Sequence, residues 1–242
     1  ENYAAVKNAK RQHTVQIEYC NNVLIDGITI RDSLVYNIRP LACDNFKVKN
    51  VKIIGCWRFN SDGIDMHNCE DVYIGDCFIR SFDDSICVKG FDCYHAGDVQ
   101  AAVRAAMYRG GHAYEDFKRT LIERCVIFND WGKSPEIGAE TRAEKIHDIT
   151  FRNCDIIHLT GAALDVMNVD YADVFDVTFK DIRIEGVLHA TLSIGVGIGE
   201  TQLIMGKCLD WDLDTNIVVT NKQPAGIVRG YGGQELNSCL SM

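Results

Sequence analysis

The sequence lacks the clustered lysines and arginines that a nucleic-acid-binding surface requires. It carries 25 Lys and Arg against 34 Asp and Glu, and its formal net charge at pH 7 is -9. Phosphate backbones are held mainly by clustered cations, so this composition argues against a nucleic-acid partner. An acidic surface instead favours a neutral or cationic partner.

Long hydrophobic runs are also absent. The chain contains no apolar stretch near the ~18 to 20 residues that a membrane-spanning helix needs. The first residues do not show the charged, apolar and small-residue series of a signal peptide. We therefore expect no membrane partner. The chain starts at Glu1, which leaves open whether a leader was removed.

The cysteines lack the spacing of a metal site. There are 11 of them, with no Cys-x-x-Cys pair and no zinc-like Cys/His pattern. An odd count argues against a complete disulfide framework, and we expect no bound metal. Buried free thiols behave as small hydrophobic side chains, which suggests a reducing compartment such as the cytoplasm. Secretion stays an alternative because of the open question of a leader.

One hydrophobic pattern is present six times, with apolar residues mostly at relative positions 0, 2, 5 and 7. The copies start at Val23, Phe46, Val72, Thr120, Ile149 and Val177, at separations of 23, 26, 48, 29 and 28 residues. The period of two within each half indicates two short strands joined by a one-residue turn. A further apolar pair, such as Ile64 and Met66, adds a third strand to the lap.

A strand-based repeat of this length predicts a solenoid. We expect an all-β fold, a right-handed, single-stranded parallel β-helix with three strands per coil, forming one domain over residues 1–242. Cys77, Cys125 and Cys154 share one position of successive copies and should form a ladder of inward side chains. The repeat fades toward the C-terminus. The chain is therefore either a piece of a longer protein or a short solenoid capped by a partner.

The longest interval between copies holds one lap plus an insertion at residues 91–118. A short helix is predicted near residues 97–118, with Asp98 as its N-cap and Gly110-Gly111 as its stop. The segment follows the strand that comes after Asp83-Asp84. It is interpreted either as a lid or wall of a cleft or as a helix that covers one flank.

Three aspartates are separated by about one lap. Asp62 lies in an Asn-Ser-Asp-Gly turn, and the pair Asp83-Asp84 follows 21 positions later. Residues one lap apart lie on neighbouring coils about 4.8 Å apart, so the three carboxylates should share one face. Such proximity raises one carboxyl pKa and leaves another group ionised, which provides the acid and the base of glycosidic cleavage. Each motif alone is also typical of an ordinary turn.

The order Asn60-Ser61-Asp62-Gly63, then Asp83-Asp84, resembles the Asn-Thr-Asp and Gly-Asp-Asp signatures of polygalacturonases, glycoside hydrolase family 28. The resemblance covers roughly residues 46–185 and implies a β-helix of the pectin-lyase-like superfamily. It further implies an inverting hydrolase with Asp83 as the general acid. By the same resemblance, Asp62 and Asp84 together activate the water.

Two later signatures of that family are missing. Lys133 stands where the Gly-His-Gly signature has its histidine, and Leu164-Asp165-Val166-Met167 replaces an Arg-Ile-Lys strand that grips a uronate carboxylate. An acidic sugar next to Glu136 and Asp165 would be repelled instead of being held by a bidentate arginine. We therefore expect the substrate to be a neutral glycan and not a galacturonan.

The outward positions of the same face are predicted to bind substrate. Strand alternation places polar side chains there that can hydrogen-bond sugar hydroxyls, and Trp131 can stack on a sugar ring. The predicted binding residues are Asp65, His67, Lys89, Trp131, Lys133, Glu136 and Asp165, and Cys87 should face outward among them. Solvated strand positions explain Asp65 and His67 equally well, and simple packing explains Trp131. Glu140 and Arg142 are expected to form a surface ion pair.

The leading interpretation is a glycoside hydrolase that works by single displacement, needs no cofactor and takes a carbohydrate substrate. The alternative is a non-catalytic carbohydrate-binding β-helix, which the missing histidine, arginine and lysine permit. A polysaccharide lyase is a third option, supported only by Lys89 and Lys133. The sugar, the linkage and the oligomeric state stay open.

Overall fold

A computed structural model of the chain describes residues 12–90, 116–170 and 172–188, together with five short strands further on. Within these residues the regular elements are β-strands, and no α-helix is present. Accordingly, the described part contains no helix long and apolar enough to cross a membrane.

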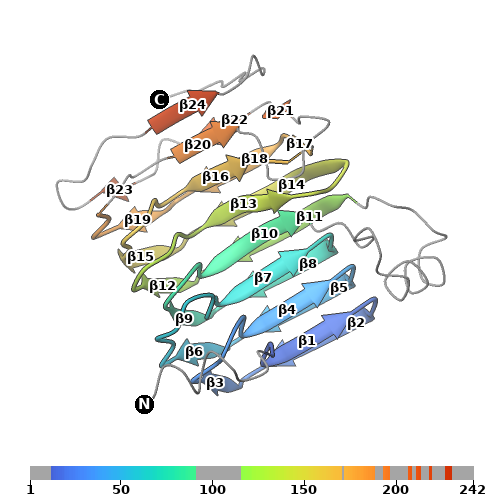
Figure 1. The fold of residues 1–242 in the computed structure, drawn as a ribbon, viewed down its shortest axis with the longest axis vertical. Helices are drawn as coiled ribbons and strands as arrows, with labels where there is room; N and C mark the ends of the chain where they lie inside the picture. Colours follow the sequence, from blue (N-terminus) through green and yellow to red (C-terminus); the bar gives the residue numbers. More distant parts are fainter. Residues whose placement is uncertain are drawn as a thin grey trace.

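The strands pair in parallel into three sheets that stack coil upon coil (Figure 1). The first sheet has the order β1 (Val15–Glu18), β4 (Ile38–Leu41), β7 (Ile64–His67), β10 (Ile86–Gly90), β13 (Glu136–Thr141), β16 (Asp165–Asn168), β20 (Ser193–Val196), β24 (Ile227–Gly230). The second has the order β2 (Asn21–Asp26), β5 (Asp44–Lys49), β8 (Glu70–Gly75), β11 (Phe117–Glu123), β14 (Lys145–Arg152), β17 (Asp173–Val174), β21 (Lys207–Cys208), and β18 (Val177–Lys180) joins β14 to β22 (Trp211–Leu213). The third has the order β3 (Thr29–Arg31), β6 (Lys52–Ile54), β9 (Phe78–Ser81), β12 (Val126–Asn129), β15 (Asp155–His158), β19 (Arg183–Ile184), β23 (Val218–Val219).

Successive strands of the chain enter the three sheets in turn, so each lap is one coil. The predicted parallel β-helix with three strands per coil is therefore confirmed. The assignment of residues 1–242 to a single domain stays a prediction.

The sequence repeat becomes a set of side-chain ladders inside the coils. Residues at the same repeat position are register partners on neighbouring strands, as in the ladder Ile25, Val48, Ile74, Ile122, Phe151, Phe179. Phe151 and Phe179 stack with their ring centroids 5.3 Å apart. The predicted cysteine ladder is also present, because Cys77, Cys125 and Cys154 are all buried. The apolar positions of the repeat thus form the core, except in the first copy, where Ile28 is exposed.

The turn between the second and third sheets is made by one residue in the left-handed conformation. Its φ lies between 51° and 72° in all six copies of the repeat, at Gly27, Asn50, Asp76, Arg124, Asn153 and Asp181. Gly, Asn and Asp tolerate this conformation best. Arg124 is the exception, and its guanidinium is paired with Asp76 one coil below (Nε–Oδ1 2.8 Å). The predicted one-residue turn is confirmed.

The predicted helix near residues 97–118 meets the described residues only at its end. There the prediction is wrong, because β11 begins at Phe117. Phe117 is fully buried and is the register partner of Ile146 on the next coil, so core packing places it in a strand. The rest of the predicted insertion, residues 91–115, lies outside the described residues.

Candidate active site

A row of acidic side chains crosses the outer face of the first sheet. Asp65 on β7, Cys87 on β10, Glu136 on β13 and Asp165 on β16 are register partners in that order. Their sequence neighbours Ile64, Ile86, Ile137 and Val166 point into the core, so strand alternation turns the row outward. All four side chains are nevertheless buried. The outer face therefore carries a desolvated polar site and not a solvated surface.

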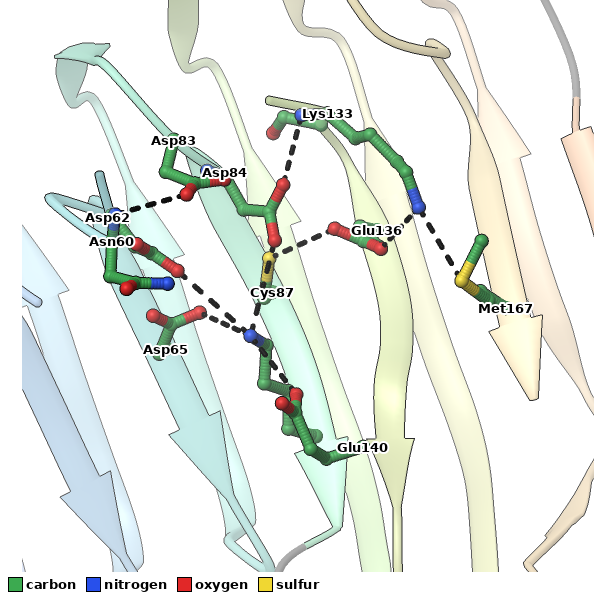
Figure 2. Close-up of polar contacts among 12 residues, drawn as sticks. Asn60, Asp62, Asp65, Asp83, Asp84, Cys87, Lys133, Glu136, Glu140 and Met167 are labelled. Atoms are coloured by element: carbon green, nitrogen blue, oxygen red, sulfur yellow. Dashed lines mark hydrogen bonds and ion pairs between the residues drawn. The ribbon is translucent and has the colours of Figure 1, made fainter. Parts of the chain in front are cut away.

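The three predicted catalytic aspartates meet at the edge of this row, in the turns that lead into β7 and β10 (Figure 2). One carboxylate oxygen from each of Asp62, Asp83 and Asp84 lies within 4.8 Å of the others. The turns are tied together by backbone hydrogen bonds, in which the Gly63 N–H donates to the Asp84 carbonyl oxygen (2.8 Å). At Gly63 a Cβ atom would come within 2.2 Å of the Ser85 carbonyl oxygen, so this close approach requires glycine.

Asp83 is oriented by two backbone N–H groups. The Asn60 N–H donates to Oδ2 (3.0 Å) and the Asp84 N–H donates to Oδ1 (3.1 Å). Burial and the neighbouring Asp84 carboxylate nevertheless raise the pKa of Asp83, outweighing these hydrogen bonds. A carboxyl group that holds its proton more tightly than usual is thereby fixed in one orientation.

Lys89 lies among the other carboxylates. Its Nζ is 3.9 Å from Asp62 Oδ2, 3.6 Å from Asp65 Oδ1, 3.9 Å from Asp84 Oδ2 and 3.2 Å from Glu140 Oε2. The lysine side chain is only 4% exposed. Burial alone would lower the pKa of Lys89, but Asp65 and Glu140 raise it well above its usual value. A permanent positive charge is therefore held at the centre of the site.

The acids around Lys89 differ in their tendency to ionise. Burial, together with Asp65, raises the pKa of Asp62 well above its usual value. Burial also raises the pKa of Asp65 to about 6, although Lys89 opposes this. For Glu140, burial favours the neutral form but the attraction of Lys89 prevails and lowers the pKa. The site thus combines carboxyl groups whose pKa is raised with one whose pKa is lowered.

Lys133 binds Glu136 and Asp165, the members of the acidic row furthest from Asp65. Its backbone N–H donates to Asp84 Oδ1 (3.0 Å), and its Nζ donates to Glu136 Oε1 and Asp165 Oδ2 (3.0 Å each). Burial would lower the pKa of Lys133, but Glu136 and Asp165 raise it. The ammonium also lies 3.6 Å from the Met167 sulfur. The lysine that replaces the expected histidine is thus directed along the acidic row, as Figure 2 shows.

Glu136 and Cys87 complete this side. Burial and the Asp84 carboxylate raise the pKa of Glu136 well above its usual value. The Cys87 Sγ lies 3.5 Å from Glu136 Oε2 and among the acids, as its outward placement predicts, but it has no exposed surface. Burial and nearby negative charges raise the pKa of the Cys87 thiol. It is therefore a neutral group of the site.

The remaining predicted residues lie on two sides of the aspartates. His67 is the register partner of Lys89, and burial with nearby Arg39 lowers its pKa well below the usual value, so it is neutral. It borders a hollow of about 290 Å³ lined by His13, Val35, Tyr36, Arg39, Asn60, His67 and Glu140. Trp131 is exposed and precedes the turn at Lys133. All the predicted residues therefore surround one site, and their roles stay predictions.

Sequence reasoning missed two features of this site. Glu140 was expected to pair with Arg142, but that pairing is wrong, because Glu140 contacts Lys89 while Arg142 Nε lies 3.4 Å from Asp170 Oδ1. Tyr36 was not predicted, although Lys89 Nζ lies 5.3 Å from the centre of its ring. Glu140 and Tyr36 lie on other coils than Lys89, and their contact with it depends on the register between strands, which the sequence does not reveal.

Two groups of side chains have the spacing of cation ligands. Asp62, Asp83 and Asp84 form one, and Asp84, Cys87 and Glu136 form the other, each with its ligand atoms within 4.8 Å of one another. The Lys89 ammonium already lies beside two of the carboxylates in the first group.

Comparisons with known proteins agree with this geometry. Residues 2–114 match the sequence model of glycosyl hydrolases family 28. Over 86 residues the chain is 31% identical to a probable polygalacturonase of Vitis vinifera, a match that covers 35% of this chain and 18% of the grapevine protein. The crystal structure of a hyperthermoactive exopolygalacturonase from Thermotoga maritima superposes with a TM-score of 0.52 at 18% identity. That superposition covers 86% of this chain and 55% of the Thermotoga chain.

Proposed function

The resemblance of this chain to polygalacturonases of glycoside hydrolase family 28 is confirmed, and from it we propose that the chain hydrolyses an O-glycosidic bond of a polysaccharide or oligosaccharide. The chain spans a small part of the grapevine relative and about half of the Thermotoga relative. The proposal for this chain therefore rests on its own residues. The observation that carries the proposal is the convergence of Asp62, Asp83 and Asp84 within 4.8 Å on neighbouring coils.

Asp83 is proposed as the general acid that protonates the leaving oxygen. A general acid must hold its proton near the working pH. Burial and the charge of Asp84 raise the pKa of Asp83 in this direction. Its two N–H contacts, from Asn60 and Asp84, fix the orientation of the carboxyl group. The environment of Asp83 therefore supports this role.

Asp62 and Asp84 are proposed to activate the water together. A water molecule that donates hydrogen bonds of about 2.8 Å to two acceptors spans roughly 4.4 Å between them. One oxygen of each carboxylate lies within 4.8 Å of the other, close enough for both to contact a single water. Lys89 lies 3.9 Å from an oxygen of each, and its charge opposes the burial that raises the pKa of Asp62.

We propose that the reaction inverts the anomeric centre, as the family resemblance implies. The carboxyl groups lie closer together than the about 6.5 to 9.5 Å typical of inverting enzymes, so spacing alone does not carry this step. Its support is the pairing of Asp62 with Asp84, whose nearest oxygens are close enough for both to contact a single water.

The proposed substrate is a neutral glycan. A uronate carboxylate needs a cation that is free to bind it. On the coils where polygalacturonases grip the uronate, the described cation is Lys133, and its ammonium is already bound to Glu136 and Asp165 at 3.0 Å. A second carboxylate would compete with both acids. Hydroxyl groups can instead accept from Lys133 and donate to the acids.

The proposal is tested with the substitution Asp83→Asn and a matched surface control, Asp32→Asn. Release of reducing ends is measured on a panel of neutral polysaccharides and on oligogalacturonate, and thermal unfolding shows whether each variant folds. We expect wild type and Asp32→Asn to cleave a neutral glycan, and Asp83→Asn to lose at least about a hundredfold in rate while unfolding at an unchanged temperature.

Two readouts separate the finer parts of the proposal. The anomer first released, observed by NMR, is opposite to that of the substrate if inversion is correct. Preferred cleavage of oligogalacturonate would overturn the choice of a neutral substrate. Full activity of Asp83→Asn would overturn the acid, and binding without turnover by wild type would identify a non-catalytic carbohydrate-binding protein.

A further inference from the structure

Three aromatic rings from three successive coils meet beside the aspartates. Phe59 precedes β7, Phe82 lies between β9 and β10, and Trp131 lies between β12 and β13. The Phe82 and Trp131 rings are parallel within 10° at 6.1 Å, and Phe59 meets both edge-on, at 5.6 Å from Phe82 and 5.1 Å from Trp131. We call these three residues the aromatic cluster.

Two rings of the aromatic cluster are open to solvent. Phe59 is 54% exposed and Trp131 is 53% exposed, whereas Phe82 is partly buried against the core. Exposed aromatic residues that occur singly are ordinary, but a contiguous apolar patch marks a binding surface. The core of the β-helix is already filled by the apolar ladders of the repeat. Core packing therefore does not explain why Phe59 and Trp131 gather outside it.

Each residue of the aromatic cluster is followed in the sequence either by Asp83 or by a residue that lies against Asp83. Phe59 precedes Asn60, whose N–H donates to Asp83 Oδ2. Phe82 precedes Asp83 itself. Trp131 precedes Gly132, whose added Cβ would come within 2.6 Å of the Asp83 carbonyl carbon. The cluster and the proposed acid are thus built from the same turns.

Hydrogen bonds hold the backbone of Trp131 next to that of Phe82. Its own N–H donates to Asn129 Oδ1 (3.1 Å), and the following N–H, of Gly132, donates to the Phe82 carbonyl oxygen (3.2 Å). Asn129 also donates to the Asp83 carbonyl oxygen. The backbone that carries the indole is therefore tied to the turn that carries the acid.

We propose that the aromatic cluster binds the sugar on the leaving-group side of the bond that is cleaved, by stacking against its C–H face. This inference rests on the proposed hydrolase function, because Asp83 must hydrogen-bond the oxygen that leaves. In Figure 2, Asp83 lies at one edge of the carboxylates and Glu140 at the opposite edge, with Asp62 and Asp84 nearer the middle. Because Phe82 directly precedes Asp83 and Phe59 directly precedes Asn60, which hydrogen-bonds Asp83, a sugar whose oxygen reaches Asp83 lies within reach of the rings.

The chemistry of the cluster defines what it can bind. Three hydrocarbon rings offer dispersion contact and the exclusion of water, and no charge. The matching ligand is a pyranose ring with an uninterrupted face of C–H groups, supplied by the second sugar of the substrate. The glycan is then recognised by polar contacts at the acidic row and by stacking on the leaving-group side.

The test compares Trp131→Ala and Phe59→Ala with the control Trp57→Ala. Trp57 is 50% exposed and stacks with the Arg58 guanidinium (4.2 Å), so it matches Trp131 in kind and exposure. Binding of short gluco-, xylo- and galacto-oligosaccharides and of oligogalacturonate is measured by calorimetry in an Asp83→Asn background, where turnover does not interfere. We expect Trp131→Ala to weaken binding roughly tenfold, Phe59→Ala to weaken it less, and Trp57→Ala to leave it unchanged.

Kinetics locate the sugar. With an oligosaccharide, Trp131→Ala should lower kcat/KM by about tenfold, and with a glycosyl fluoride of the same first sugar the loss should largely vanish, because the leaving fluoride carries neither a second sugar nor an aromatic ring. Equal losses on both substrates overturn the leaving-group assignment. If Trp131→Ala binds as tightly as Trp57→Ala, or if no variant binds any oligosaccharide, the proposed subsite is overturned. The hydrolase proposal survives either result if wild type still cleaves a glycan.

Discussion

Removal of the charge of Lys89 is the perturbation with the best-defined consequence. In the variant Lys89→Met the side chain keeps its length and loses its ammonium. Four carboxylates lie within 3.2 to 3.9 Å of that ammonium and would then face one another without a cation between them. Water screens them little, because the Lys89 side chain is only 4% exposed. The variant therefore isolates the electrostatic role of Lys89 from its packing.

The magnitude follows from the distances. Two unit charges 4 Å apart interact by about 4 kcal/mol at an effective dielectric constant near 20. Loss of one partner from a buried ion pair typically costs about 3 to 5 kcal/mol of unfolding free energy. We expect a loss of that size at neutral pH. Loss of the ammonium raises the pKa of the carboxyl groups by roughly 2 units, so they can reduce this cost by taking up a proton.

The dependence on pH has a definite sign. In Lys89→Met the folded-state pKa values of the carboxyl groups rise above their unfolded values, so the folded state binds more protons than the unfolded state. Stability is then complete below the unfolded pKa, about 4, and is lost as the pH rises through the raised folded values. The variant should resemble wild type near pH 4 and differ most near pH 7 and above.

The assay is chemical unfolding at a series of pH values, with the exposed Lys52→Met as the control for loss of a surface charge. The acidic limb of the kcat/KM profile is recorded in parallel. It should move to higher pH by roughly 2 units, because the water-activating pair then needs a higher pH to ionise. A loss of stability that is the same at pH 4 and pH 7, together with an unmoved acidic limb, would refute the role given to Lys89.

Two further predictions concern single positions. Because burial raises the pKa of Asp65 to about 6, wild-type stability should fall as the pH rises from about 4 to 7. Asp65→Asn should remove up to about 3 kcal/mol of that fall, and an unaltered pH dependence of unfolding would contradict the assigned protonation. Gly63→Ala should cost about 1 to 3 kcal/mol or more, because its Cβ would lie 2.2 Å from the Ser85 carbonyl oxygen. Gly27→Ala, with φ of 72° but nothing within 4 Å, should cost only about 1 to 2 kcal/mol, and equal costs would contradict the steric account.

The fold was predictable because the repeat is local. Apolar residues at fixed spacing indicate where strands lie, and residues such as Asn50 and Asp76 mark the turns by tolerating the left-handed conformation. The meeting of Asp62 with Asp83 followed from one fact, that their separation of 21 residues is close to one coil, which takes 22 residues between β7 and β10. Arg124 shows the limit, because nothing local announces a left-handed turn at an arginine.

The contacts of the long side chains were not predictable in this way. Lys89 and Lys133 each reach carboxylates on neighbouring coils, and the choice of partner depends on register and side-chain direction, which spacing does not reveal. The same is true of Glu140, which contacts Lys89 and not its neighbour Arg142. Phe59 and Phe82 read as ordinary apolar turn residues until stacking brings them to Trp131.

The most direct test of the central claim is the reducing-end assay on purified protein with wild type and Asp83→Asn side by side. The juxtaposition of Asp62, Asp83 and Asp84 predicts cleavage of a neutral glycan by wild type and at least about a hundredfold less by a variant that folds equally well. Equal rates for the two proteins, or no cleavage of any glycan by wild type, would contradict it.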